Sequence, residues 1–216
     1  MKIFLDTSDV DIIRKHCETG LIDGVTTNPT LMMQAGKNPV KVISDISSLF
    51  ESDASISAEV VADSAEEMIT QAEQYYSIND NITIKVPCNY EGLKACRVLS
   101  SKDINVNVTL IFSLNQSILA AKSGATYISP FIGRCEDNDI DGIDLISSIR
   151  KVFNLNNIST NILAASIRNI NHINESFKAG ADIVTIPPKV FEEMYHHDLT
   201  DLGLAQFDKD WKKLNS

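Results

Sequence analysis

Short runs rich in β-branched residues alternate along the chain with longer stretches whose apolar residues recur at helical spacing. The alternation repeats about every 20 to 30 residues, which is typical of consecutive strand and helix units in a parallel sheet. It predicts eight strands, at residues 2–6, 24–28, 55–60, 82–87, 104–112, 125–129, 161–166 and 182–187.

The predicted helices between these strands begin and end at suitable residues. Ser8 is placed to cap the first helix, and Asn38 precedes a proline at a first helical position. Gly124 and Gly180 each lie between a helix and the next strand, where positive φ favours glycine. With no linker between the units, the pattern predicts one α/β domain, residues 1–216, folded as a (β/α)8 TIM barrel rather than an open sheet.

Polar and apolar residues alternate within several strands. In a barrel, this alternation separates side chains that face the helices from those that face the interior. The strand at 82–87 places Lys85 on its polar side, and the strand at 55–60 does the same with Glu59. The strand at 104–112 groups Leu110 with helix-facing apolar residues. The inward polar residues near the carboxyl ends of the strands are Asp6, Glu59, Lys85, Asn107 and Thr109.

Lys85 is unusual because a barrel interior is normally filled by branched apolar side chains, and a charge there carries a desolvation penalty. Barrel enzymes place their chemistry at the carboxyl ends of the strands, where Lys85 is predicted to lie. Burial disfavours the ammonium form, and the neutral amine forms Schiff bases with carbonyl substrates while a nearby carboxylate carries protons. The alternative is a purely structural ion pair of Lys85 with Asp6 or Glu59.

The sequence gives little support for a metal or another cofactor. Its four histidines lack HExxH or Cys/His spacing, and its four cysteines form no CxxC pair. Reduced structural thiols are therefore expected, including Cys88 after the lysine strand. The segment DNDIDG, residues 137–142, begins like a calcium loop, but the twelfth position is Ser148 instead of glutamate. We predict an acidic surface loop that leads into a helix, no metal and no cofactor.

The charge of the chain limits its partners. The net charge of -10 and the pI near 4.8 repel polyanions, so neither nucleic acid nor an anionic membrane is an expected partner. No leader-like segment and no apolar run of about 20 residues is present, which favours a cytoplasmic protein. An anionic small molecule would need a local cationic pocket.

Eight segments of the sequence together resemble the transaldolase family, in its short single-domain branch that also contains fructose-6-phosphate aldolases. The segments are FLDT, DGVTTNPTL, SAEV, IKVP, NVTLIFS, ISPFIGR, ASIRN and GADIVTIP, in this order along nearly the whole chain. The resemblance implies sugar-phosphate substrates and a Schiff base between Lys85 and the C2 ketone of a ketose phosphate. It implies that Asp6 takes the C4 hydroxyl proton during cleavage, and that Glu59 and Thr109 position the water that relays protons.

The resemblance also implies a set of substrate-binding residues. Asn28 and Asn107 would hold hydroxyls of the bound three-carbon unit, with Ser129 nearby. Each asparagine has a plainer alternative, because Asn28 begins a good turn and Asn107 could satisfy neighbouring polar groups, as could Thr109. Arginines in loops are often solvated, but here the resemblance implies a phosphate site after the sixth and seventh strands. Its residues are Arg134, Ser166 and Arg168.

Two positions distinguish the activities within this branch. The aldolases usually carry glutamine where this chain has Glu59 and tyrosine where it has Phe131, so the resemblance implies a transaldolase. Such an enzyme transfers dihydroxyacetone from sedoheptulose 7-phosphate to glyceraldehyde 3-phosphate, giving erythrose 4-phosphate and fructose 6-phosphate in the pentose phosphate pathway. The alternatives are a fructose-6-phosphate aldolase and, more remotely, a sugar-phosphate binding protein without catalysis.

The last predicted helix, at about residues 200–214, lies beyond the eighth strand-helix unit and has a partly apolar face. It could pack on its own barrel. The resemblance implies instead a homo-oligomer, a pentamer or decamer in which this helix contacts a neighbouring subunit.

Overall fold

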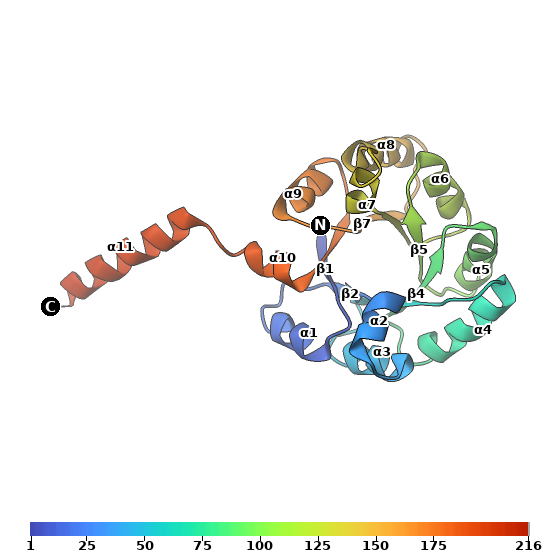
Figure 1. Cartoon of the computed structure of the whole chain (residues 1–216), viewed down its shortest axis with the longest axis horizontal. Coiled ribbons are helices and arrows are strands. Elements are labelled where there is room, and N and C mark those ends of the chain that lie inside the picture. Colours follow the sequence, from blue (N-terminus) through green and yellow to red (C-terminus); the bar gives the residue numbers. More distant parts are fainter. Residues whose placement is uncertain (216) are drawn as a thin grey trace.

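A closed ring of eight parallel strands forms the centre of the computed structural model, which describes residues 1–215. Each strand pairs with the next, and the last pairs with the first, as Figure 1 shows in a view down the ring. The predicted (β/α)8 barrel is therefore confirmed. The strands are β1 Lys2–Asp6, β2 Gly24–Thr26, β3 Ser55–Glu59, β4 Ile82–Pro87, β5 Val106–Ile111, β6 Tyr127–Pro130, β7 Asn161–Ala164 and β8 Ile183–Ile186.

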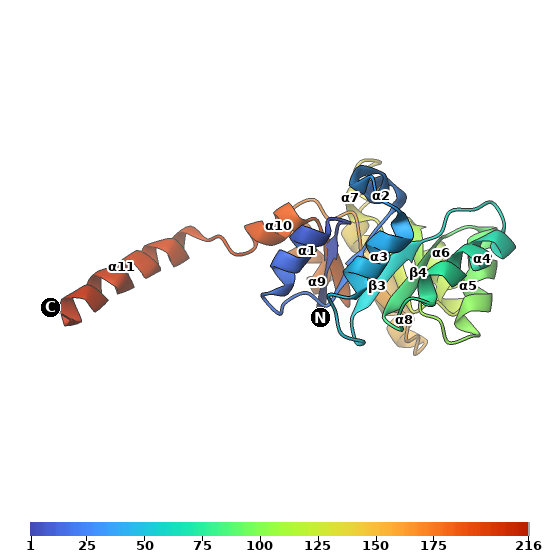
Figure 2. The same ribbon diagram turned by 90° about the horizontal axis from the view of Figure 1, so that it is seen from below.

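Helices cover the outside of the ring, apart from α2 and α7, which lie at one end of it, and α11, which leaves it (Figures 1 and 2). The end that carries α2 and α7 is the one where the carboxyl ends of the strands lie, because both helices directly follow strands. The helices are α1 Val10–Cys17, α2 Pro29–Ala35, α3 Pro39–Ser47, α4 Ala65–Tyr76, α5 Tyr90–Ser100, α6 Leu114–Lys122, α7 Ile132–Glu136, α8 Gly142–Leu155, α9 Ile170–Lys178, α10 Pro188–Glu193 and α11 Asp198–Leu214.

The ends of several elements differ from the prediction, among them the cap of α1 and the bounds of six of the eight predicted strands. Asp9, and not Ser8, caps α1, because its carboxylate accepts hydrogen bonds from the N–H groups of Asp11 and Ile12. The Ser8 hydroxyl instead donates to the carbonyl of Leu31, which ties the start of α1 to α2. The second strand is also shorter than predicted, since it stops at Thr26 and the chain turns into α2. This early stop brings the residues after β2 to the mouth of the barrel.

Apolar side chains close the amino-terminal end of the barrel interior. Phe4, Leu163 and Ile183 form a buried cluster there, and Tyr127 packs edge-on against Phe4 with ring centroids 6.3 Å apart. Gly24 makes room for this cluster, since a Cβ there would lie 2.9 Å from the Phe4 ring. Burying each such side chain stabilises the fold by about 1.5–3 kcal/mol. We call these four apolar residues the barrel floor, and the polar inward residues lie above it.

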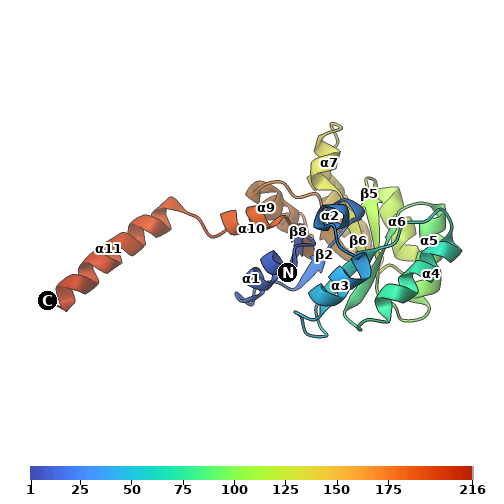
Figure 3. The same cartoon turned by 60° about the horizontal axis from the view of Figure 1, so that its bottom comes forward.

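The C-terminal helix α11 extends away from the barrel in all three views (Figures 1–3). None of its described residues is buried, and Leu199, Phe207 and Trp211 are exposed at 70%, 72% and 67%. Packing of this helix on its own barrel, the first of the two alternatives, is therefore wrong for this structure. No helix within residues 1–215 has the length and apolar character needed to cross a membrane.

Candidate active site

A cavity of about 290 Å³ opens at the carboxyl ends of the strands, above the barrel floor. Barrel enzymes bind their substrates at this end. The cavity brings together nine of the eleven residues that the sequence suggested, namely Asp6, Asn28, Glu59, Lys85, Thr109, Ser129, Phe131, Arg134 and Ser166.

Lys85 points into this cavity from β4 and is fixed by two neighbours. Its Nζ lies 2.9 Å from Glu59 Oε2 and donates a 3.1 Å hydrogen bond to the carbonyl of Thr27. Glu59 and Lys85 are direct partners in the ladder between β3 and β4, and their side chains are 14% and 6% exposed. The ion pair considered as a structural alternative thus exists, with Glu59 as its partner. It lies on the wall of an open cavity, where its amine is within reach of a ligand.

Asp6, at the end of β1, is partly buried in the cavity wall and is held by a short chain of hydroxyls. Thr26 Oγ1 donates to Asp6 Oδ1 over 2.8 Å, and Thr185 Oγ1 lies 2.6 Å from Thr26 Oγ1. Because a threonine hydroxyl has one proton, Thr185 donates to Thr26 when Thr26 donates to Asp6. Burial raises the pKa of Asp6, while Lys85 and the Thr26 hydrogen bond oppose that rise. This carboxyl group is therefore suited to both accept and release a proton.

Thr26 and Thr185 were missed in the sequence. The signal was available, because both fall on the inward side of their strands, two residues after Gly24 and Ile183. The same alternation that identified Lys85 would have found them.

Asn107 lies beneath the cavity wall instead of on it, fully buried beside Lys85 in the ladder between β4 and β5. Its Oδ1 accepts a 2.8 Å hydrogen bond from Ser129 Oγ. This bond fixes the orientation of the Asn107 amide. Within residues 1–215, neither Asn107 Nδ2 nor Thr109 Oγ1 has a hydrogen-bond partner. Buried polar groups are normally satisfied, so two unpartnered atoms this close to the cavity are unusual.

Asn28 has two functions at once. Its Oδ1 accepts a 3.0 Å hydrogen bond from the Leu31 N–H and so caps α2, with Pro29 at the first helical position. Asn28 is thus a helix cap instead of the turn that was its plainer alternative. Asn28 nevertheless lines the cavity, and the cap occupies only its oxygen. Its amide NH2 has no hydrogen-bond partner within residues 1–215, so it can donate to a ligand.

Leu110 does not face the helices, contrary to the alternation in the sequence. The register of β5 with β6 shifts between Val108 and Ile111, and Leu110 has φ of 60°. A bulge of this kind adds a residue to the strand and redirects its side chains. Leu110 therefore lines the cavity, where it is one of its apolar surfaces.

Arg134 provides a positive charge at one side of the mouth, next to Phe131 and Ser166. Arg134 is on α7, and Phe131 directly precedes that helix. The guanidinium carbon of Arg134 lies 5.0 Å from the centre of the Phe131 ring. Ser166 follows β7 with φ of 58°, a conformation that costs about 1–3 kcal/mol for a residue other than glycine and that clusters at functional sites. The carbonyl of Ser166 accepts a 3.1 Å hydrogen bond from Gly133 N–H, which joins the two loops.

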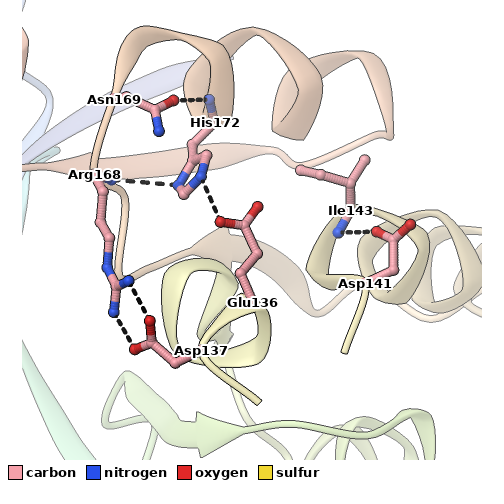
Figure 4. Close-up of polar contacts among 7 residues, drawn as sticks. All are labelled: Glu136, Asp137, Asp141, Ile143, Arg168, Asn169 and His172. Carbon is pink, nitrogen blue, oxygen red and sulfur yellow. Dashed lines mark hydrogen bonds and ion pairs between the residues drawn. The ribbon is translucent and has the colours of Figure 1, made fainter. Parts of the chain in front are cut away.

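Arg168 does not line the cavity. Its guanidinium is bound to the carboxylate of Asp137 by two parallel hydrogen bonds, one of them from Nη1 to Oδ1 over 2.6 Å (Figure 4). Asp137 follows α7 directly, so this pair joins the two loops outside the mouth. The predicted phosphate site is therefore only partly assembled, with Arg134 and Ser166 in the cavity and Arg168 beside it.

The remaining sequence features have structural functions. Asp141 caps α8 by accepting from the N–H groups of Ile143 and Asp144, which agrees with an acidic loop that leads into a helix. Cys88 is half-buried after β4, and burial raises the pKa of its thiol to about 11. A thiol with so high a pKa stays protonated near neutral pH and is a poor nucleophile. The amine of Lys85 remains the nucleophile that the site presents.

The sequence and the fold are similar to those of known proteins. Proteins named probable transaldolase from Paracoccus denitrificans and Symbiobacterium thermophilum are 50% and 48% identical to this chain. The two alignments cover 99% and 98% of this chain, and 97% of each relative. A solved thiamine phosphate pyrophosphorylase from Pyrococcus furiosus has a TM-score of 0.60 over 90% of this chain and 93% of its own, at 15% identity, which supports the barrel fold alone.

A sequence model of one family matches residues 3–216, and its description is Transaldolase/Fructose-6-phosphate aldolase. Together with the names of the relatives, this match supports an aldolase-type activity of the transaldolase class. The chain therefore belongs to the transaldolase and fructose-6-phosphate aldolase family.

Proposed function

We propose that this protein is a transaldolase that transfers a dihydroxyacetone unit between sugar phosphates through a Schiff base at Lys85. The observation that carries the proposal is the position of the Lys85 amine, 2.9 Å from the Glu59 carboxylate on the wall of a cavity that also contains Asp6. Schiff-base chemistry needs an amine that loses its proton, and a carboxylate at hydrogen-bond distance accepts that proton.

In the proposed sequence, neutral Lys85 Nζ attacks the C2 ketone of sedoheptulose 7-phosphate, and the carbinolamine that forms loses water to give the imine. Glu59 supplies and removes the protons of these steps, with Thr109 Oγ1 orienting the water. Asp6 then takes the C4 hydroxyl proton, the C3–C4 bond breaks, and erythrose 4-phosphate leaves while the electron pair remains as an enamine on Lys85. The enamine carbon attacks the aldehyde carbon of glyceraldehyde 3-phosphate, Asp6 returns its proton to the aldehyde oxygen, and hydrolysis of the new imine releases fructose 6-phosphate and the Lys85 amine.

The polar groups around the amine support the binding of this three-carbon unit. Asn28 Nδ2 and Asn107 Nδ2 are the amide donors, the second one fixed by the bond from Ser129 to its Oδ1. Arg134 and Ser166 provide a cation and a hydroxyl at the mouth for the substrate phosphate. These positions support a binding mode with the reacting ketone deep in the cavity and the phosphate at its opening.

Phe131 supports transfer over simple cleavage. Its ring lines the cavity and has no hydroxyl with which to protonate the enamine. An enamine that is not protonated keeps the dihydroxyacetone unit until an acceptor aldehyde arrives. A fructose-6-phosphate aldolase would protonate it and release free dihydroxyacetone, and that reaction is the second function to test.

The decisive test combines trapping with a coupled assay. We expect borohydride with fructose 6-phosphate to reduce the imine and leave a covalent sugar adduct on Lys85, and we expect sedoheptulose 7-phosphate to be consumed rapidly only when glyceraldehyde 3-phosphate is present. Lys85→Ala should abolish both. Rapid release of dihydroxyacetone without an acceptor would assign the aldolase reaction instead. A folded protein that binds the sugar phosphate but leaves Lys85 unmodified would make it a binding protein.

We also propose that α11 mediates a homo-oligomer. Its exposed apolar residues and its extension away from the barrel support this assembly, because an amphipathic helix without a covered face is marginal in water. Phe207→Asp with Trp211→Asp should lower the molecular mass in analytical ultracentrifugation while the circular dichroism of the barrel persists. An unchanged mass would remove α11 from the assembly.

A further inference from the structure

Arg168 pairs with Asp137 outside the cavity. The other two residues of the predicted phosphate site, Arg134 and Ser166, line the cavity. Both Nη atoms of Arg168 donate to the two carboxylate oxygens of Asp137 (Figure 4). This is the same fork-to-fork arrangement that an arginine makes with a phosphate. The carboxylate therefore occupies the donors that a phosphate would need.

The backbone of Arg168 is anchored, so only its side chain is free to change partner. Its N–H donates to Nδ1 of the buried His172 over 3.3 Å, and His172 Nε2 lies 3.0 Å from Glu136 Oε2. Since Nδ1 accepts, the ring proton is on Nε2 and is donated to Glu136. The Arg168 and Asp137 side chains, by contrast, are 46% and 50% exposed.

The path of the Arg168 side chain brings it next to the mouth. It crosses α7 at Gly133, where a Cβ would lie 2.5 Å from Arg168 Nε, and Gly133 is adjacent in sequence to Arg134. Arg168 and, to a smaller degree, Arg134 lower the pKa of Asp137, so the carboxylate interacts with both cations. A phosphate at Arg134 would thus approach the same two charges.

We propose that Asp137 weakens phosphate binding at the site by competing with the substrate phosphate for Arg168. This inference rests on the proposed sugar-phosphate reaction. An exposed ion pair is weak, so a dianionic phosphate held by Arg134 and Ser166 displaces Asp137 and gains the Arg168 contact. A neutral sugar leaves Arg168 on Asp137. Arg168 then adds affinity for phosphorylated substrates alone.

The test measures binding of inorganic phosphate by calorimetry at constant low ionic strength, because salt screens exposed charges. We expect Asp137→Asn to bind phosphate about 2- to 5-fold more tightly, the range that follows from the strength of an exposed ion pair. Asp139→Asn is the matched control, because it removes the same charge two positions further along the chain. Asp139 has φ of 55°, a backbone conformation that asparagine also accepts. It should change phosphate affinity less than Asp137→Asn.

A second pair of variants separates competition from a general loss of negative charge. In an Arg168→Gln protein, Asp137→Asn should give no further gain. Unchanged or weaker phosphate binding by Asp137→Asn, or the same gain without Arg168, would overturn the proposal; weaker binding would mean that Asp137 positions Arg168 for phosphate. In turnover, we expect KM for fructose 6-phosphate to fall while KM for unphosphorylated fructose stays constant.

The phosphate titration needs no turnover, so it tests Asp137 independently of the reaction. Borohydride trapping on the same samples reports whether the Schiff base forms. A sample that traps but binds phosphate no more tightly refutes only the proposal for Asp137. A sample that binds phosphate more tightly but never traps refutes only the proposed reaction.

Discussion

Lys85 Nζ and Glu59 Oε2 lie 2.9 Å apart, on residues that are direct partners in the parallel ladder between β3 and β4. Strand register, not loop conformation, therefore fixes the distance between the proposed nucleophile and its proton acceptor. Sites held by strands are more precisely positioned than sites on loops.

Glu59→Gln should keep the shape of this contact and remove its charge. We expect kcat for transfer to fall by about 10²-fold, as for other losses of a proton-transfer group, because Lys85 has no carboxylate to take its proton. Single-turnover trapping with borohydride should show slower imine formation. Glu73→Gln, an exposed change on α4, is the control, and equal kinetics for the two variants would exclude Glu59 from proton transfer.

Asp6→Asn should raise stability and lower activity. Burial raises the pKa of Asp6 in the folded state, so the folded protein holds this proton more tightly than the unfolded chain. The ionised carboxylate therefore destabilises the fold once the pH exceeds the ordinary value of 3.8. In urea unfolding, the variant should be more stable than the wild type at pH 7, and the gap should narrow as the pH falls toward 3.8. Activity should drop by about 10²- to 10⁴-fold.

The opposite trend would contradict this assignment. A variant less stable than the wild type at pH 7 would mean that the contacts of ionised Asp6 with Lys85 and Thr26 outweigh its burial.

Thr185→Val should change the pKa of Asp6 indirectly, through Thr26. Losing the hydroxyl removes the donor to Thr26, so Thr26 stabilises the Asp6 carboxylate less and the pKa of Asp6 rises further. The acid limb of the plot of kcat against pH should move to higher pH. The free energy of unfolding should fall by about 0.5–1.5 kcal/mol, because one hydrogen bond is lost. Thr160→Val is the matched control, since that buried hydroxyl donates to the Ala125 carbonyl away from the site. A shift of the limb in both variants would rule out a specific effect.

Gly133→Ala should weaken the phosphate side of the site. The added Cβ would lie 2.5 Å from Arg168 Nε and 2.6 Å from the Ser166 carbonyl, so both residues must move. We expect KM for fructose 6-phosphate to rise about 10-fold, and overpacking to cost about 1–3 kcal/mol in thermal unfolding. Gly203→Ala is the control, because nothing lies within 4 Å of that Cβ and alanine favours the α11 helix. An unchanged KM in Gly133→Ala would show that Arg168 and Ser166 adjust freely.

The barrel and most of its inward polar residues could be predicted because strands alternate with period two and each strand is short. Lys85, Glu59 and Asp6 follow from that rule. Leu110 does not, since a bulge with positive φ breaks the alternation within β5, and no residue type in that segment signals it.

Contacts between distant loops were beyond the sequence for a different reason. The pairing of Arg168 with Asp137 joins residues 31 positions apart and depends on the space at Gly133. The orientation of α11 was equally out of reach, because an amphipathic face predicts that something covers it and not which surface does so.

The barrel floor of Phe4, Tyr127, Leu163 and Ile183 fills part of the barrel interior on the side away from the cavity mouth. In the proposed reaction, the aldehyde that leaves and the aldehyde that arrives must therefore pass through the same mouth, beside Arg134 and Phe131. Two such molecules compete for one passage, so the first product has to depart before the acceptor enters. For the proposed reaction, we therefore expect a ping-pong order, in which the first aldehyde leaves before the acceptor aldehyde binds.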